Sequence, residues 1–193
     1  MKKLVKIFVV AAFAFGFGVT AQAQEREATI NVGATVMDAL SVTANGNLAF
    51  GIVMQGAAKR IDAAGAVTTT DSSDPSTTGA TTGQFIVHAG AGSSVTLEFE
   101  VPSVLEGDGD ATLPIYFNKA LNGTSEADNV GYGTAGSSIT RLEVDEPNSI
   151  TFPSTTVNDK IGTRVYVGGT VIPSATQANG AYIGTITLTA TYN

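Results

Sequence analysis

The chain has 193 residues, a formal net charge of −7 and no cysteine. An acidic protein is a poor partner for nucleic acids and for anionic membrane surfaces, and without cysteine the hydrophobic core must hold the fold with no help from disulfides. Glycine is abundant and charged residues make up only 14% of the chain, a composition typical of secreted all-β proteins rather than helical ones.

The first residues have the pattern of a secretory signal peptide. A cationic start, MKKLVK, precedes the apolar run IFVVAAFAFGFGV, and Ala21 and Ala23 then occupy the two positions that a signal peptidase reads. The run is short for a membrane span, so we expect cleavage after Ala23, leaving a single domain at 24–193. The mature chain is expected in the periplasm, at the cell surface or outside the cell, with no membrane span.

Short segments with period-two alternation follow along the mature chain. The first, ATINVGATV, places Ile30, Val32, Ala34 and Val36 on one face, as in a β-strand. A hairpin turn is expected near Ala64-Gly65, between two strands of the segment 56–70. Further strands are predicted within 39–44, 47–54, 84–90, 93–102, 112–118, 138–144 and 164–172, with 84–90 and 93–102 expected to pair with each other. This pattern predicts an antiparallel β-sandwich of about eight to ten strands, immunoglobulin-like or pilin-like.

The last predicted strand, YIGTITLTATYN, is one of the most regular. Threonine dominates one face, and the other face is apolar or aromatic. That second face carries Tyr182, Gly184, Ile186, Leu188 and Tyr192. Because the ends of chains usually fray, a terminal strand of this quality is expected to be held by packing.

No group of residues predicts catalysis, cofactor binding or a metal site. The mature chain has one histidine, His88, which without cysteine excludes the common zinc sites, and no nucleophile motif accompanies it. Glu106, Asp108 and Asp110 alternate in EGDGDA, but the spacing of a calcium loop is absent, so we expect a solvated acidic turn. The chain is therefore not expected to be an enzyme.

Two motifs resemble a bacterial secreted family catalogued as domain of unknown function 4402. The early motif NLAFG supplies Leu48, Phe50 and Gly51, and Gly168 and Gly169 form a pair before the last connection. The late motif supplies Gly180, Tyr182, Gly184 and Tyr192. The family name implies no activity.

The same ending is similar to the pilin domains of chaperone–usher systems, including the spore-coat-U-like pilins, although the disulfide that many of them carry is missing. This resemblance implies an incomplete sandwich that is completed by the N-terminal segment of a neighbouring subunit. Ile30, Val32, Ala34 and Val36, within a possible extension at 24–37, would form the donor strand. The implied partners are further copies of the chain, a periplasmic chaperone and an usher.

Two functions remain open at this point. The first is an exported structural or adhesive surface protein, of the kind that builds a fimbria by donor-strand exchange. The second is a secreted ligand-binding module, for instance for glycans, that stays monomeric. The sequence does not decide between them, because a first strand that pairs within its own chain has the same alternation as a donor strand.

Overall fold

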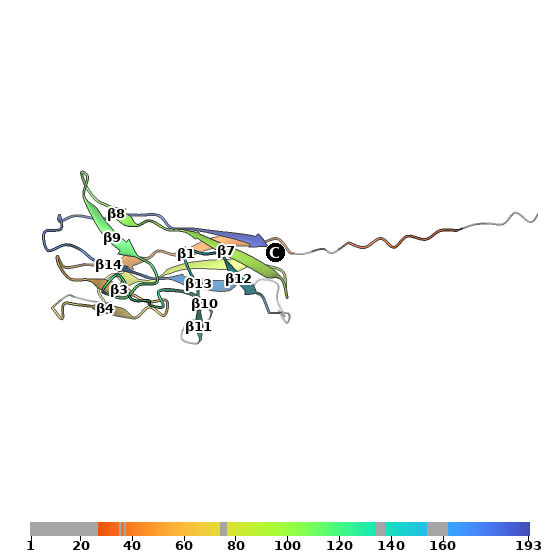
Figure 1. The fold of residues 1–193 in the computed structure, drawn as a ribbon, viewed down its shortest axis with the longest axis horizontal. Coiled ribbons are helices and arrows are strands. Elements are labelled where there is room, and N and C mark those ends of the chain that lie inside the picture. The colour runs from red at the N-terminus through yellow and green to blue at the C-terminus, as the bar shows by residue number, and fades with distance from the viewer. Residues whose placement is uncertain (1–26, 35, 37, 74–76, 134–137, 154–161) are drawn as a thin grey trace, which may run out of the picture. The chain divides into compact units, whose positions relative to one another are not determined.

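Every regular element in the described part of the chain is a β-strand (Figure 1). The structure is a computed structural model that describes residues 27–34, 36, 38–73, 77–133, 138–153 and 162–193. The chain divides into two units, Met1–Val36 and Met37–Asn193. The predicted signal peptide at 1–23 lies outside the described residues. No helix of the described residues is long and apolar enough to cross a membrane.

Fifteen strands are present in the described residues, all within the second unit. They are β1 (Ser41–Gly46), β2 (Ala49–Phe50), β3 (Lys59–Ile61), β4 (Val67–Thr69), β5 (Ala80–Thr81), β6 (Gly83–His88), β7 (Ser94–Glu100), β8 (Val104–Glu106), β9 (Thr112–Tyr116), β10 (Val130–Gly133), β11 (Ile139–Arg141), β12 (Asn148–Thr151), β13 (Thr163–Val167), β14 (Gly169–Val171) and β15 (Thr187–Tyr192).

The strands form four sheets, and every strand pairing is antiparallel. One five-stranded sheet has the order β1-β6-β13-β10-β11 and the other has the order β4-β3-β14-β9-β8. A three-stranded sheet, β12-β7-β15, and the two-stranded pair β2-β5 complete the domain. The predicted all-β antiparallel sandwich is confirmed.

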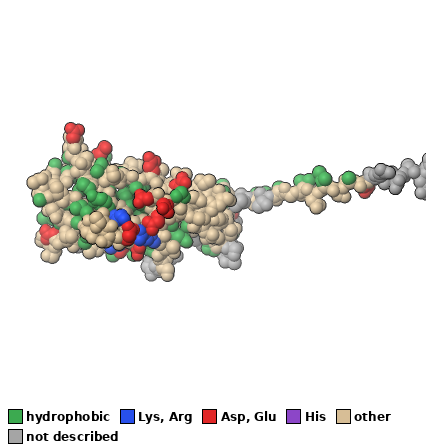
Figure 2. Space-filling model, in the orientation of Figure 1, with side chains coloured by type: hydrophobic (Ala, Val, Ile, Leu, Met, Phe, Trp, Pro, Cys, Tyr) green, Lys and Arg blue, Asp and Glu red, His purple; other side chains and the backbone are tan. Residues whose placement is uncertain are grey.

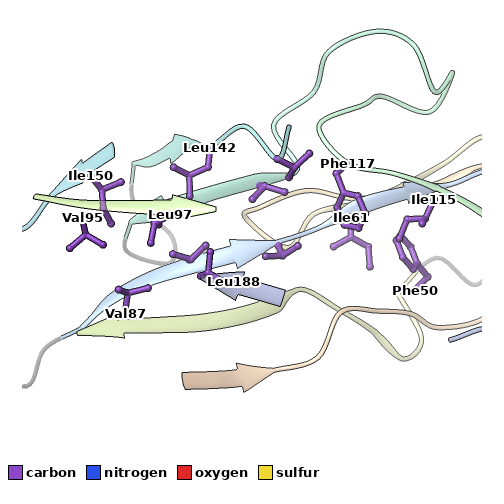
Figure 3. Packing of buried hydrophobic residues seen from close by; sticks show 14 of the residues in the cluster. Phe50, Ile61, Val87, Val95, Leu97, Ile115, Phe117, Leu142, Ile150 and Leu188 are labelled. Carbon is purple, nitrogen blue, oxygen red and sulfur yellow. The ribbon is translucent and has the colours of Figure 1, made fainter. Parts of the chain in front are cut away.

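One apolar core joins these sheets (Figure 3). Val87 of β6 lies in the same buried cluster as Val95 and Leu97 of β7 and Leu188 of β15. The cluster continues into the second five-stranded sheet through Ile61 and neighbouring side chains. Alternation explains these positions, because every second residue of a strand faces the same side.

The number of strands exceeds the predicted eight to ten because some predicted strands are interrupted. The segment 164–172 forms two strands, β13 and β14, which belong to different five-stranded sheets. Gly168 lies between them and passes so close to β3 that an added Cβ would lie 2.1 Å from the carbonyl oxygen of Ile61. A side chain does not fit at this crossing, so glycine is needed where the chain changes sheets.

Two further expectations on pairing have different outcomes. The hairpin near Ala64-Gly65 is confirmed: β3 pairs with β4, and Gly65 has a positive φ of 88°. The expected pairing of 84–90 with 93–102 is wrong. These segments form β6 and β7, which lie in different sheets, because the connection at 89–93 crosses between the layers of the sandwich instead of closing a hairpin.

Candidate functional site: an uncharged groove beside β1 and β15

Two strands, β1 and β15, each have one open edge in the described part of the chain. β1 pairs only with β6, and β15 pairs only with β7. The two strands approach each other without pairing (Figure 1). Such edges leave backbone N–H and C=O groups available for a further strand.

A groove of about 830 Å³ lies between the segments that continue from these edges. The first wall is formed by residues between Ala44 and Gln55, and the second wall by residues between Gln177 and Ile186. The side chains between the walls come mainly from inner strands and are Phe85, Pro102, Leu105, Leu113, Ile115 and Val167. None of the described residues that line the groove is charged.

Small residues keep both walls thin. The first wall includes Ala44, Gly46, Ala49 and Gly51, and the second includes Ala178, Gly180, Ala181 and Gly184. At Gly184 an added Cβ would lie 2.7 Å from the Leu105 side chain, so a larger residue there would press on the apolar base of the groove. The shape therefore leaves room for branched side chains that enter from outside.

Hydrogen bonds join the two sides at one end of the groove and again beyond its other end. At one end the Gln55 side chain donates to the carbonyl oxygen of Gln177, and the amide of Gly56 donates to the carbonyl oxygen of Ser174 at 3.0 Å. Beyond the lining residues Ala44 and Ile186, the Tyr192 hydroxyl at the end of β15 donates to the carbonyl oxygen of Asp38 at 2.7 Å, just before β1. β1 and β15 therefore run in opposite directions.

The predicted C-terminal face is only partly a strand. Regular pairing begins at Thr187, so Tyr182, Gly184 and Ile186 precede β15. The reason is a change of partner: Ile183 exchanges backbone hydrogen bonds with Glu106 at the end of β8, both at 2.8 Å, before the chain joins β7.

The alternation itself persists through both parts of the C-terminal segment. Leu188 is 7% exposed and belongs to the core, while Tyr182, Ile186 and Tyr192 pack against it. The Tyr182 hydroxyl accepts a hydrogen bond from the Gln177 side chain at 2.6 Å and donates one to the carbonyl oxygen of Ala178 at 2.7 Å. Tyr182 therefore fixes the shape of the second wall.

The predicted strand at 28–36, which we call the N-terminal arm, forms no strand in its described residues, 28–34 and 36. Ile30, Val32 and Val36 are 83%, 87% and 94% exposed, and Ala34 is exposed as well. The expected strand is absent from these described residues for a simple physical reason. Alternation prepares one face for burial, but a strand forms only where another backbone edge accepts its hydrogen bonds.

The other residues singled out in the sequence do not line the groove. His88 is the half-buried last residue of β6, opposite Ser41. Glu106 ends β8, and Asp108 and Asp110 lie in the exposed turn that leads to β9. The described residues contain no cluster of three or more histidine, aspartate or glutamate side chains suited to a metal ion.

Basic side chains gather elsewhere on the surface, whereas acidic ones are spread over the face shown in Figure 2. Glu126 accepts hydrogen bonds from Lys119 and Arg141, and Arg141 also donates to Glu143 at 3.1 Å. The hydrogen bond from Lys119, followed by that from Arg141, lowers the pKa of Glu126 below its usual range. These charged groups lie outside the groove lining, so the groove stays a neutral strip on an acidic domain.

Comparison with known families adds one finding. A family model described as a domain of unknown function, DUF4402, matches residues 40–192. The chain belongs to the DUF4402 family. Comparison with curated proteins and with solved structures gives no significant match.

The motifs that resembled DUF4402 in the sequence meet at the groove. Leu48, Phe50 and Gly51 of the early motif line the first wall. Gly180, Tyr182 and Gly184 of the late motif line the second wall, whereas Tyr192 lies outside the lining and bonds the backbone just before β1. Sequence reasoning did not predict a groove here, although the two motifs were the signal that marked both walls.

Proposed function

We propose that this protein is an exported structural subunit of the cell surface that assembles by strand addition. In this proposal the groove accepts the N-terminal arm of a second copy, and repetition of this contact builds a polymer. The proposal rests on two observations: an uncharged groove next to the open edge of β1, and an uncharged segment whose apolar face is exposed.

The arm and the groove match in charge and in size. The arm has no charged residue, whereas Glu27 and Asp38 lie just outside it. Its nine residues would extend for about 30 Å as a strand, and the second wall is formed by a segment of similar length, 177–186. An uncharged groove would bind the neutral centre of this segment and exclude its charged flanks.

Burial of the arm would supply a large stabilisation. Ile30, Val32, Ala34 and Val36 together would contribute about 5–8 kcal/mol on moving from water into an apolar groove. Backbone hydrogen bonds to the open edge of β1 would add to this value and would fix the register.

An uncovered apolar groove is a liability before assembly, since it invites wrong partners. A carrier that lends a strand to the groove would solve this problem, and a periplasmic chaperone with an outer-membrane usher is the pair that the pilin resemblance implies. Genes for both beside the gene of this protein would support the arrangement.

The lining of the groove fits the alternative, a monomeric glycan-binding module, less well. Sugar recognition relies on hydrogen-bonding groups beside aromatic faces, but most groove residues are apolar or lack a polar side chain. A catalytic role has no support either, because His88 does not line the groove. We therefore place the function in assembly rather than in chemistry.

Matched charge substitutions in the arm test the proposal. Val32→Asp places a carboxylate on the face that enters the groove, where an unpaired charge is prohibitive. Asn31→Asp adds the same charge on the opposite face, which stays in solvent. We expect Val32→Asp to abolish detergent-resistant ladders of the protein on gels and Asn31→Asp to retain them, with equal melting temperatures for both purified monomers.

A peptide experiment checks the same contact without polymerisation. A synthetic peptide of residues 27–38 should raise the melting temperature of a variant that lacks 24–36, because a ligand that binds only the folded state stabilises it. A peptide of the same composition with Val32 and Gly33 exchanged, which breaks the apolar face, is the control. Equal ladders from Val32→Asp and Asn31→Asp, with no effect of either peptide, would rule out the proposed function.

A further inference from the structure

The arm and the groove belong to the same chain, so the arm has two candidate destinations. It can enter its own groove or that of another copy. We propose that Tyr192 prevents entry into its own groove and so reserves the groove for the arm of a second copy. This inference rests on the proposed function of the groove as a strand acceptor, and it makes Tyr192 a positioning residue for assembly.

The need for such a device follows from effective concentration. A segment tethered by a short flexible linker has an effective concentration in the millimolar range at its own site. Only four residues, 37–40, separate the arm from β1. At micromolar protein concentrations an open groove would therefore be filled by its own arm, and polymers would not form, unless the fold hinders self-entry.

The direction of the chain decides where self-entry must occur. A segment joined to β1 by four residues can lie beside β1 only as the second strand of a hairpin, antiparallel to β1. Because β1 and β15 run in opposite directions, this strand would be parallel to β15. It would have to reach the groove from the side of Asp38, along β1.

Tyr192 lies at the start of that route, outside the groove lining. Its hydroxyl donates to the carbonyl oxygen of Asp38 at 2.7 Å and accepts a hydrogen bond from the amide of Gly90 at 2.9 Å. The side chain also packs against the core, so it is held from both sides. Val36, the last apolar residue of the arm, is only two residues from Asp38 in the sequence, so an arm entering its own groove would have to begin its strand beside this hydrogen bond.

An arm from a second copy is not subject to this restriction. It carries no tether to Asp38 of the acceptor, so it can enter along the length of the groove, away from Tyr192. The two hydrogen bonds of the Tyr192 hydroxyl thus hinder entry of the chain's own arm but not of an arm from another copy. The groove itself is the same in both cases.

Disulfide trapping distinguishes the two destinations, because the chain has no cysteine of its own. Val32→Cys is combined in three separate variants with Ala44→Cys, Ala49→Cys or Ala181→Cys, which sample the two walls. Each pair is made with Tyr192, with Tyr192→Phe, and with Tyr132→Phe as a control for loss of a tyrosine hydroxyl other than the one bonded to Asp38. Non-reducing gels at several protein concentrations then separate linked copies from internally linked monomers.

With Tyr192 or with Tyr132→Phe, we expect disulfides between copies and a ladder. With Tyr192→Phe, we expect the internally linked monomer to increase about tenfold or more at micromolar concentration, independent of dilution. Melting temperatures of the reduced proteins verify that each variant is folded.

Three other results would each overturn a different part of the proposal. An unchanged ladder with Tyr192→Phe refutes the role of Tyr192 and leaves the groove function intact. Internally linked monomers alone in the presence of Tyr192 refute exchange between copies, although the groove still accepts the arm. If no pair forms a disulfide in any background, the proposed function of the groove fails together with this inference.

Discussion

The two ends of the mature chain carry the same kind of pattern and have opposite fates. The arm alternates over Ile30, Val32, Ala34 and Val36 and is exposed without a strand partner in its described residues. The C-terminal segment alternates in the same way, yet it pairs with β7 over Thr187–Tyr192 and contributes to the core. The pattern states which face a segment would bury, and the available backbone edge decides whether burial occurs.

Deleting one end or the other should give the largest difference in stability between two variants. A variant without 187–193 loses one of the two partners of β7 and the buried Leu188, so we expect it not to fold. A variant without 24–36 should keep the melting temperature of the monomer within error. Circular dichroism melts of the two proteins provide the measurement, and a folded protein after the first deletion would remove the distinction between the ends.

Single large-to-small changes sharpen the comparison. Leu188→Ala should lower the free energy of unfolding by about 2–4 kcal/mol, because it removes a buried side chain from a packed core. Val32→Ala should change it by less than about 0.5 kcal/mol, since exposed positions contribute little. Urea unfolding of the two purified monomers decides this. Similar losses would mean that the arm is already buried in the monomer.

A smaller effect is expected from Tyr192→Phe, which keeps the ring and removes the hydroxyl. The two hydrogen bonds to Asp38 and Gly90 are lost, and water can replace them in part because the side chain is only half-buried. We expect a loss of about 1 kcal/mol in the free energy of unfolding. A loss as large as that of Leu188→Ala would show that the hydroxyl stabilises the whole domain and not only the contact between the end of β15 and Asp38.

The smallest effect on stability is expected at Glu126, in a loop that belongs to neither end of the chain. The pKa of Glu126 is lowered in the folded protein, so its contribution to stability is present above the pKa of the unfolded chain and is lost as the pH falls through the folded-state pKa. Because the carboxylate is fully exposed, the contribution is small. Melting temperatures of wild type and Glu126→Gln should differ slightly near neutral pH and converge in acid, with ladders unchanged throughout.

Much of the fold could be predicted because it depends on local rules. Alternation and turn residues predict the sandwich, and the hairpin at Ala64-Gly65 requires only a glycine with positive φ. The assignment of β6 and β7 to different sheets could not be predicted, since a connection of five residues, 89–93, is compatible with a hairpin and with a crossing.

The groove itself could not be predicted from the sequence. Its walls come from 44–55 and 177–186, and no local pattern states that segments so far apart in the chain will lie on two sides of one depression. Only the motif residues gave a sign of it: Leu48 and Phe50 on one wall and Tyr182 on the other. The arm was recognised by its alternation, but alternation contains no information about the chain that supplies the partner edge.

The position of β7 in the three-stranded sheet has a consequence for the order of events during folding. Its partners are β12 and β15, which follow it in the sequence by tens of residues, and Val95 is paired with Tyr192. Such distant pairings make folding slow, because a long loop must close before any contact rewards it. During that interval β7 has no native neighbour, so we expect the centre of this sheet to become protected from solvent exchange late in folding.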